Sequence, residues 1–236
     1  MVRIGYIVPG TGLDSTEIKR REKVANDILR GTSKVDIIQT ENGPKYIDNA
    51  IDETYASFSY LPQLKKLENE YDSFVIGCFG DPGLRAARQL IRTPVIGPAQ
   101  SSIHFTAQVA DRYIIVEPNE EQISEERELS RRYAMDNHLA GVVAVETPVK
   151  EIVRNRDAAL KKIKNTISLA IKKYDGEAVI LGCMSMGYHL LDEILTDQLK
   201  IPVINPVKIS LKMAELQGSL KIRHSIKSYP NVVYNF

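Results

Sequence analysis

A chain of 236 residues can bury a sizeable core, either as one large domain or as two lobes of roughly 100 residues each. Its 31 Lys and Arg nearly balance its 30 Asp and Glu, for a formal net charge of +1, so no overall field favours nucleic acid or an acidic membrane surface as a partner. We therefore expect a small-molecule substrate, with no nucleic acid and no membrane involved.

The chain opens with "MVRIGYIVPGTG", whose apolar run is too short for a signal sequence or a membrane span and ends in a Pro/Gly turn. This predicts a cytoplasmic protein. Runs rich in Val and Ile then alternate with longer amphipathic stretches such as "IDETYASFSYLPQLKKLENE". The predicted strands are "RIGYIV", "VDIIQT", "SFVIGC" and "PVIG" in the first half, and "RYIIVEPN", "AGVVAVET", "EAVILGC" and "IPVIN" in the second. Such alternation is typical of βαβ units in a parallel sheet.

The second half repeats the first, because four strand-plus-turn signatures recur in one order at a nearly constant separation. The matched pairs are Pro9 with Pro118, Glu41 with Glu146, Cys78 with Cys183, and Pro98 with Pro206. We predict an α/β fold of two pseudo-symmetric lobes, each a four-stranded parallel sheet flanked by helices. Lobe 1 spans 1–98 and is completed by 206–236, lobe 2 spans 99–205, and the active site is expected in the cleft between them.

The repeat places Cys78 and Cys183, the only cysteines of the chain, at equivalent positions. Each closes the third strand of its lobe and precedes a helix, on the edge where open parallel sheets bind ligands. Packing does not require the same reactive residue at both strand ends, so we favour a chemical role. The alternatives are inert core thiols and a disulfide, which a cytoplasmic location disfavours.

Two like groups on opposite sides of a ligand suit the inversion of a carbon stereocentre, in which one removes a proton and the other returns one to the opposite face. The amides at a helix start can lower a thiol pKa and can hold an enolate. In "CFGDPGL" we expect Asp81 and Pro82 to begin the helix as N-cap and N1, and in "CMSMG" we expect Ser185 to be the equivalent cap.

Cofactor motifs are missing from the sequence: it has no GxGxxG, no Walker A string and no Lys that stands out as a Schiff-base candidate. The two cysteines form no CxxC and the four histidines are scattered. We therefore expect chemistry without a cofactor and without a metal.

The segments around both cysteines are similar to known sequences. "YDSFVIGCFGDPGLRAARQLIRTPVIGPAQSS" resembles the first-cysteine segment of hydantoin racemases, in the cofactor-independent aspartate/glutamate/hydantoin racemase superfamily. "VILGCMSMG" with "IPVINPV", and "NGPKYIDNAIDETYA", resemble further stretches of that branch. The resemblance implies a racemase or epimerase with two flavodoxin-like lobes and with Cys78 and Cys183 as its bases. It also implies that the loop after the first strand and the amides after each cysteine hold the substrate: Pro9, Gly10, Thr11, Phe79, Gly80, Met184 and Ser185. We also expect a homo-oligomer.

The chain departs from the family pattern at two strand ends. "VPGT" lacks the asparagines of the common N-P-N-T, and Glu117–Pro118 replaces the common T-T. If it lines the site, the Glu117 carboxylate would repel an acidic substrate and favour one that carries N–H donors or a positive charge. Otherwise it is a solvated loop carboxylate. We expect the substrate to be a hydantoin, allantoin or a related amino-acid-derived compound.

Two other functions stay open. One is an isomerase or decarboxylase of the same superfamily that uses a single cysteine, and the other is a non-catalytic two-lobed small-molecule binding protein. His189 either faces the cleft or is a histidine on a helix surface or in the core, the last two being the more usual arrangements.

Overall fold

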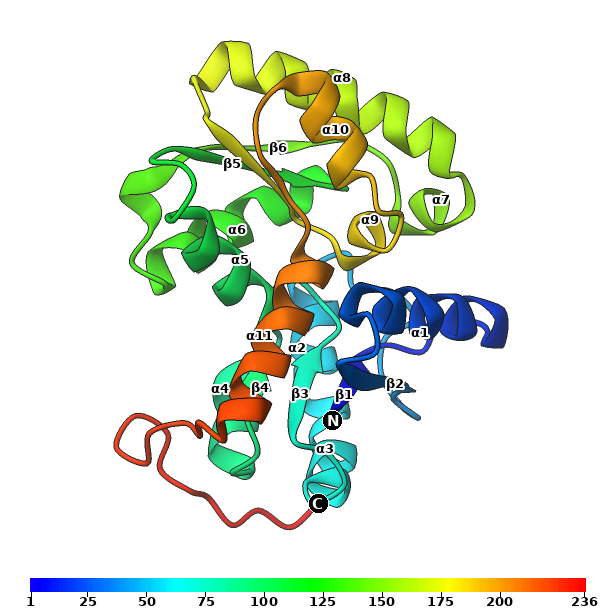
Figure 1. Ribbon diagram of the computed structural model, residues 1–236, viewed down its shortest axis with the longest axis vertical. Coiled ribbons are helices and arrows are strands. Elements are labelled where there is room, and N and C mark those ends of the chain that lie inside the picture. Colours follow the sequence, from blue (N-terminus) through cyan, green and yellow to red (C-terminus); the bar gives the residue numbers. More distant parts are fainter. The chain divides into compact units, whose positions relative to one another are not determined.

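The protein is described here by a computed structural model that covers residues 1–236, apart from the side chains of Lys150 and Val153. The chain divides into two compact units (Figure 1). Unit 1 consists of Met1–Pro98 with Ser210–Phe236, and unit 2 of Ala99–Ile209. Each unit holds a four-stranded parallel sheet flanked by helices, which confirms the predicted fold class. No helix among the described residues is both long and apolar enough to cross a membrane.

The sheet of unit 1 consists of β1 (Val2–Val8), β2 (Ser33–Gln39), β3 (Ser73–Ile76) and β4 (Val95–Ile96). The helices that accompany it are α1 (Ser15–Leu29), α2 (Ala50–Ser59), α3 (Leu61–Leu67), α4 (Leu84–Leu90) and the larger part of α11 (Pro206–Leu220). The strands lie in the order β2-β1-β3-β4, and every neighbouring pair is parallel.

Successive side chains of a strand point to opposite faces, and this alternation divides the core of unit 1. Phe74 and Ile76 pack in a buried cluster with Leu64 of α3 and Leu84 of α4. Ser73 points to the other face, where its hydroxyl donates to the Ala214 carbonyl of α11 at 2.9 Å. The sheet therefore lies between α3 and α4 on one side and α11 on the other (Figure 1).

The sheet of unit 2 consists of β5 (Tyr113–Glu117), β6 (Leu139–Ala144), β7 (Ala178–Leu181) and β8 (Val203–Ile204). Its helices are α5 (Pro98–Thr106), α6 (Ile123–Arg132), α7 (Val149–Arg154), α8 (Arg156–Tyr174), α9 (Met184–Gly187) and α10 (Asp192–Leu199), with short 3₁₀ turns at Glu120–Gln122 and Asp136–His138. The strand order β6-β5-β7-β8 repeats that of unit 1, again with parallel pairs only.

The two faces of the second sheet are covered by different helices (Figure 1). Ile114 and Val116 of β5 join Ile163 and Ile167 of α8 in one buried cluster. Tyr113 points to the opposite face, where its hydroxyl lies 3.1 Å from the Ser130 hydroxyl of α6. Residues at odd positions of β5 therefore face α6, and this fixes where Glu117 points.

Both sheets have a point where the connections diverge. In unit 1 the chain leaves β1 toward β2 on one side of the sheet and leaves β3 toward β4 on the other. In unit 2 the divergence lies between β5 and β7. Open α/β sheets bind ligands outside the carboxyl ends of the strands at such a switch point. Cys78 follows β3 and Cys183 follows β7, so both thiols lie at these positions.

The C-terminal segment after α11 is attached to unit 1 through His224. The ring Nε2 accepts a hydrogen bond from the Val95 amide at 2.9 Å, and Arg92 donates to the His224 carbonyl at 2.7 Å. Burial and the nearby Arg88 guanidinium lower the pKa of His224 to about 4. The ring is therefore neutral at pH 7, as its acceptor role requires.

We expect this contact to weaken in acid. The pKa of His224 is about 4 in the folded protein and roughly 6.5 in an unfolded chain. The stabilisation by the neutral His224 ring is therefore fully present above about pH 6.5 and is lost as the pH falls toward 4. At pH 7, His224→Ala should lower the melting temperature by about 2–4 °C, the effect of about 1 kcal/mol in a chain of this size. The difference should shrink as melting is measured at lower pH. His104→Ala, at an exposed histidine of unit 2, is the control, and a pH-independent His224→Ala effect would contradict the assignment.

Candidate active site

The Cys78 thiol is held at the edge of the first sheet by the glycine before it. The Gly77 amide donates to the Ile7 carbonyl of β1 at 2.6 Å. A Cβ at position 77 would lie 2.6 Å from the Tyr6 ring and 2.8 Å from that same carbonyl, which only glycine avoids. Cys78 follows as a half-buried thiol outside any disulfide.

The turn after Cys78 differs from the sequence expectation. Helix α4 begins at Leu84, and its N-cap is Gly83 in the left-handed region at φ 65°, so the prediction of Asp81 and Pro82 as N-cap and N1 was wrong. The reason lies in contacts that are distant in sequence. Asp81 is buried, with its carboxylate against the Cα of Gly97, and the Tyr60 hydroxyl donates to the Pro82 carbonyl at 2.8 Å.

Gly80 lies next to an acidic residue that the sequence analysis did not single out. The carboxyl atoms of Glu53, on α2, lie 3.6–3.7 Å from where a Gly80 Cβ would be. The Asn49 side chain caps α2 through the amides of Ile51 and Asp52, which fixes the start of the helix that carries Glu53. The only sequence signal was its place in the stretch "NGPKYIDNAIDETYA".

The loop after β1 is fixed to the loop after β2. Pro9 and Gly10 are buried. The Thr11 amide donates to the Pro44 carbonyl at 2.9 Å, and its hydroxyl lies 3.4 Å from the same oxygen. A Cβ on Gly10 would lie 3.0 Å from that oxygen. The backbone of this loop is therefore held close to residue 44, with Thr11 partly exposed.

The Cys183 turn repeats the first arrangement with a different neighbour. The Gly182 amide donates to the Val116 carbonyl of β5 at 2.8 Å, as Gly77 does to β1. Cys183 is a half-buried thiol and is itself the N-cap of α9, with an extended backbone (φ −138°, ψ 129°). The prediction that Ser185 caps this helix was therefore wrong. Met184 and Ser185 are buried, at 3% and 7% exposure, as is Phe79 in unit 1 at 2%.

Glu117 is fully buried behind the Cys183 turn. Its exposure is 0%, and neither carboxylate oxygen has a hydrogen-bond partner among the described residues. Burial raises the pKa of the Glu117 carboxyl well above its ordinary value, and the negative charges of Glu126, Cys183 and Glu125 act in the same direction. The alternative of a solvated loop carboxylate is therefore wrong. Gly182 is required here, because a Cβ at that position would overlap the Glu117 carboxyl.

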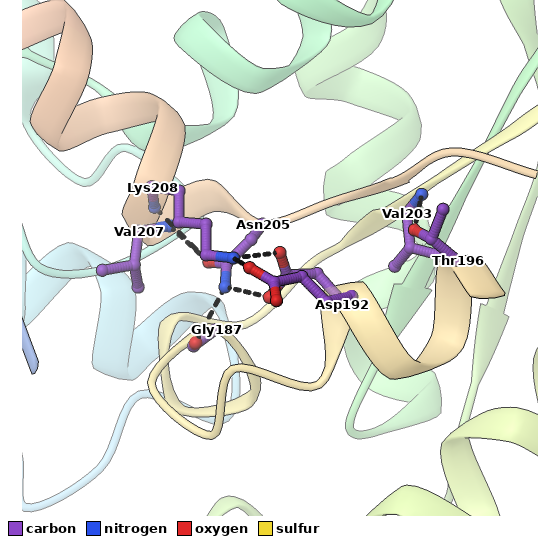
Figure 2. A network of polar contacts seen from close by, with 8 residues as sticks. Gly187, Asp192, Thr196, Val203, Asn205, Val207 and Lys208 are labelled. Atoms are coloured by element: carbon purple, nitrogen blue, oxygen red, sulfur yellow. Dashed lines mark hydrogen bonds and ion pairs between the residues drawn. The ribbon is translucent and has the colours of Figure 1, made fainter. Parts of the chain in front are cut away.

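A polar network joins the end of the short helix α9 to the starts of α10 and α11 (Figure 2). The Asn205 side-chain amide donates to the Gly187 carbonyl at 2.9 Å and to the Asp192 carboxylate at 2.8 Å. Its oxygen accepts from the Val207 amide at 3.0 Å. Lys208 donates to Asp192 at 2.6 Å. The turn that carries Cys183 is thereby tied to the end of β8.

Asn205→Asp should weaken this network. The change replaces both donated hydrogen bonds by contacts between a carboxylate and acceptor oxygens, so the free energy of unfolding should fall by about 1–3 kcal/mol. Urea denaturation at pH 7 measures this loss. Adding Asp192→Asn returns a donor to the pair and should recover part of the stability, which a double-mutant cycle quantifies. An unchanged urea midpoint in Asn205→Asp would refute the role assigned to the amide.

His189 belongs to the core. It is 8% exposed, its Nε2 contacts the Ile152 carbonyl, and its own carbonyl accepts from Arg156 at 3.1 Å. The expectation of a core histidine at this position is therefore confirmed.

Each unit thus brings a reduced cysteine, a preceding glycine and an acidic side chain to the carboxyl edge of its sheet. In unit 1 these are Cys78, Gly77 and Glu53, and in unit 2 they are Cys183, Gly182 and Glu117. Acid–base chemistry at carbon is what such thiols and carboxyls can perform.

Comparison with known proteins shows the family to which the chain belongs. Residues 4–214 match the Asp/Glu/Hydantoin racemase family. Hydantoin racemase from Paenarthrobacter aurescens is 31% identical over 194 residues, 81% of each chain. Hydantoin racemase from Pseudomonas sp. (strain NS671) is 29% identical over 230 residues, which cover 97% of this chain and 91% of that protein. The solved structure of allantoin racemase from Klebsiella pneumoniae has a TM-score of 0.91 and 30% identity, covering all of this chain and 95% of that one.

The chain therefore belongs to the Asp/Glu/hydantoin racemase family, and it is an isomerase of the racemase type. The resemblance inferred from the motifs around the two cysteines is confirmed.

Proposed function

We propose that this racemase inverts a carbon stereocentre without a cofactor, with Cys78 and Cys183 as its two acid–base groups. The observation that carries the proposal is the equivalence of the two thiols. Each is half-buried, follows the third strand of its sheet and comes directly after a glycine whose amide binds the neighbouring strand. A core thiol has no reason to recur with these features.

In the proposed reaction one cysteine, as thiolate, removes the proton from one face of the carbon. The pair of electrons left behind is delocalised as an enolate, and the other cysteine, as thiol, gives its proton to the opposite face. The reverse reaction exchanges the two roles. General acid–base catalysis of this kind contributes about 10²- to 10⁴-fold. The amides of the residues after each cysteine are the proposed donors to the enolate oxygen.

We propose a ureide ring as the substrate class, such as a 5-substituted hydantoin or allantoin, or a related amino-acid-derived compound. The support comes from the names of the relatives, which are hydantoin and allantoin racemases. Such rings carry the reacting carbon beside a carbonyl, so the proton is acidic enough for a thiolate to remove. They also carry N–H groups, which can donate hydrogen bonds to acidic side chains such as Glu53.

Replacing either cysteine should abolish racemisation. We expect Cys78→Ser and Cys183→Ser each to lower the rate for a hydantoin or allantoin by at least about 100-fold, because each removes one of the two proton carriers. Polarimetry of enantiopure substrates measures the rate, after subtraction of the uncatalysed reaction. In D₂O each variant should still exchange the substrate proton for deuterium from one enantiomer only.

Exchange without inversion is the diagnostic result, because it separates loss of one base from loss of the whole site. Racemisation at the wild-type rate in either variant would contradict the two-base scheme. A covalent adduct on one cysteine, or release of carbon dioxide, would favour the alternative of a single-cysteine isomerase or decarboxylase. Alkylation of both thiols at neutral pH, slowed by substrate, would argue against a non-catalytic binding protein whose cysteines are inert.

A further inference from the structure

We propose that Glu117 is a positioning residue for Cys183 that shares one proton with its thiol, so that the carboxyl and the thiol together carry a single negative charge. Its role in racemisation rests on the proposed two-cysteine function, whereas the proton coupling itself can be measured without a substrate.

The placement of the carboxyl is the first ground for this proposal. Glu117 is the last residue of β5, on the face toward α6. Gly182 directly follows β7, and its amide binds the carbonyl of Val116, the residue before Glu117. The carboxyl lies so close to the Gly182 Cα that any side chain at 182 would overlap it. Gly182 directly precedes Cys183, so the buried carboxyl lies immediately behind the reactive turn.

The second ground is that the carboxyl is fully enclosed and has no hydrogen-bond partner among the described residues. An ionised carboxylate buried without a partner is strongly unfavourable, and such a group takes up a proton instead. The groups whose charge acts on it, Glu126 and Glu125 of α6 and Cys183, are all acidic and favour the same protonated form. Burial and these charges therefore favour the protonated, neutral form of Glu117 beside Cys183.

The third ground is the difference between the two units. Val8 ends the stretch of β1 that corresponds to β5, and it is the apolar, buried counterpart of Glu117. The two strand ends thus have the same backbone arrangement, with Gly77 and Gly182 bound alike. Only unit 2 carries a carboxyl at this position. The Glu117 carboxyl therefore acts on Cys183 and not on Cys78, which serves as an internal control.

The coupling follows from the balance of one proton between two groups. With the carboxyl protonated, Cys183 can lose its proton and act as the base. With the carboxyl ionised, the thiol keeps its proton, because two negative charges so close together are unfavourable. Moving the proton from the thiol to the carboxylate gives a thiolate and a neutral acid, with no change in total charge. Glu117 thus sets the ratio of thiol to thiolate at Cys183 alone.

The test measures the rate of alkylation of each cysteine by iodoacetamide across pH 6–10, resolved by peptide mass spectrometry. Glu117→Gln keeps the size of the neutral acid and can never ionise. We expect the alkylation midpoint of Cys183 to move to lower pH by about one unit, and that of Cys78 to stay unchanged. Glu128→Gln, which removes an exposed carboxylate from α6, is the matched control and should move neither midpoint.

An unmoved Cys183 midpoint in a folded Glu117→Gln protein would overturn the proposal, and so would an equal shift at both cysteines. If that variant does not fold, Cys183→Ser gives the reciprocal measurement. Coupling between two sites acts equally in both directions, so loss of the thiolate should lower the pH at which the infrared band of the protonated carboxyl disappears. An unchanged band would overturn the proposal. Neither result depends on racemase activity, so the inference and the proposed function can fail separately.

Discussion

The placement of both cysteines in this protein depends on one backbone hydrogen bond that occurs twice. The amide of the glycine before each cysteine donates to the neighbouring strand, Gly77 to Ile7 and Gly182 to Val116. This bond extends the parallel hydrogen-bond ladder by one residue. The cysteine that follows is the first residue beyond the sheet. Both thiols consequently lie at a topological switch point, where the connections diverge and leave room for a ligand.

The same constraint explains why the residues around the thiols differ between the units. At each glycine the space normally taken by a Cβ is filled by something else. In unit 1 the Tyr6 ring and the β1 backbone fill it, and in unit 2 the Glu117 carboxyl does. The fold is therefore pseudo-symmetric in its backbone but not in its electrostatics. Cys183 has a buried acid behind it, whereas the turn that carries Cys78 contains the buried Asp81 and lies next to Glu53 of α2.

Each cysteine turn is held by contacts with other parts of its own unit. In unit 2, Asn205 ties the end of α9 to Asp192 and to the start of α11 (Figure 2). In unit 1 the corresponding ties are Tyr60 to Pro82 and the packing of Asp81 beneath Gly97. Tyr60, Gly97 and Asn205, which hold these turns, are distant in sequence from the cysteines. A site held in this way keeps its geometry without help from a bound ligand.

The sequence by itself determined the architecture and singled out the two cysteines. The alternation of Val/Ile runs with amphipathic stretches predicted all eight strands, because the period of apolar residues reflects burial locally. The repeat then gave two sheets and placed Cys78 and Cys183 at equivalent strand ends. The motifs around them indicated the racemase family. Each of these signals is contained in a short segment or in a comparison of segments.

Tertiary structure alone decided what surrounds those residues. Glu117 is buried because α6 lies against its face of β5. No pattern in the sequence around position 117 predicts that contact. Helix α4 begins at Leu84 and not at the predicted Asp81, because Asp81 packs against Gly97 and the Tyr60 hydroxyl binds the Pro82 carbonyl of the turn. Glu53 reached Gly80 from a different helix. Local preferences set the strands and helices, but the burial and charge of each site residue are sums over neighbours that are distant in the chain.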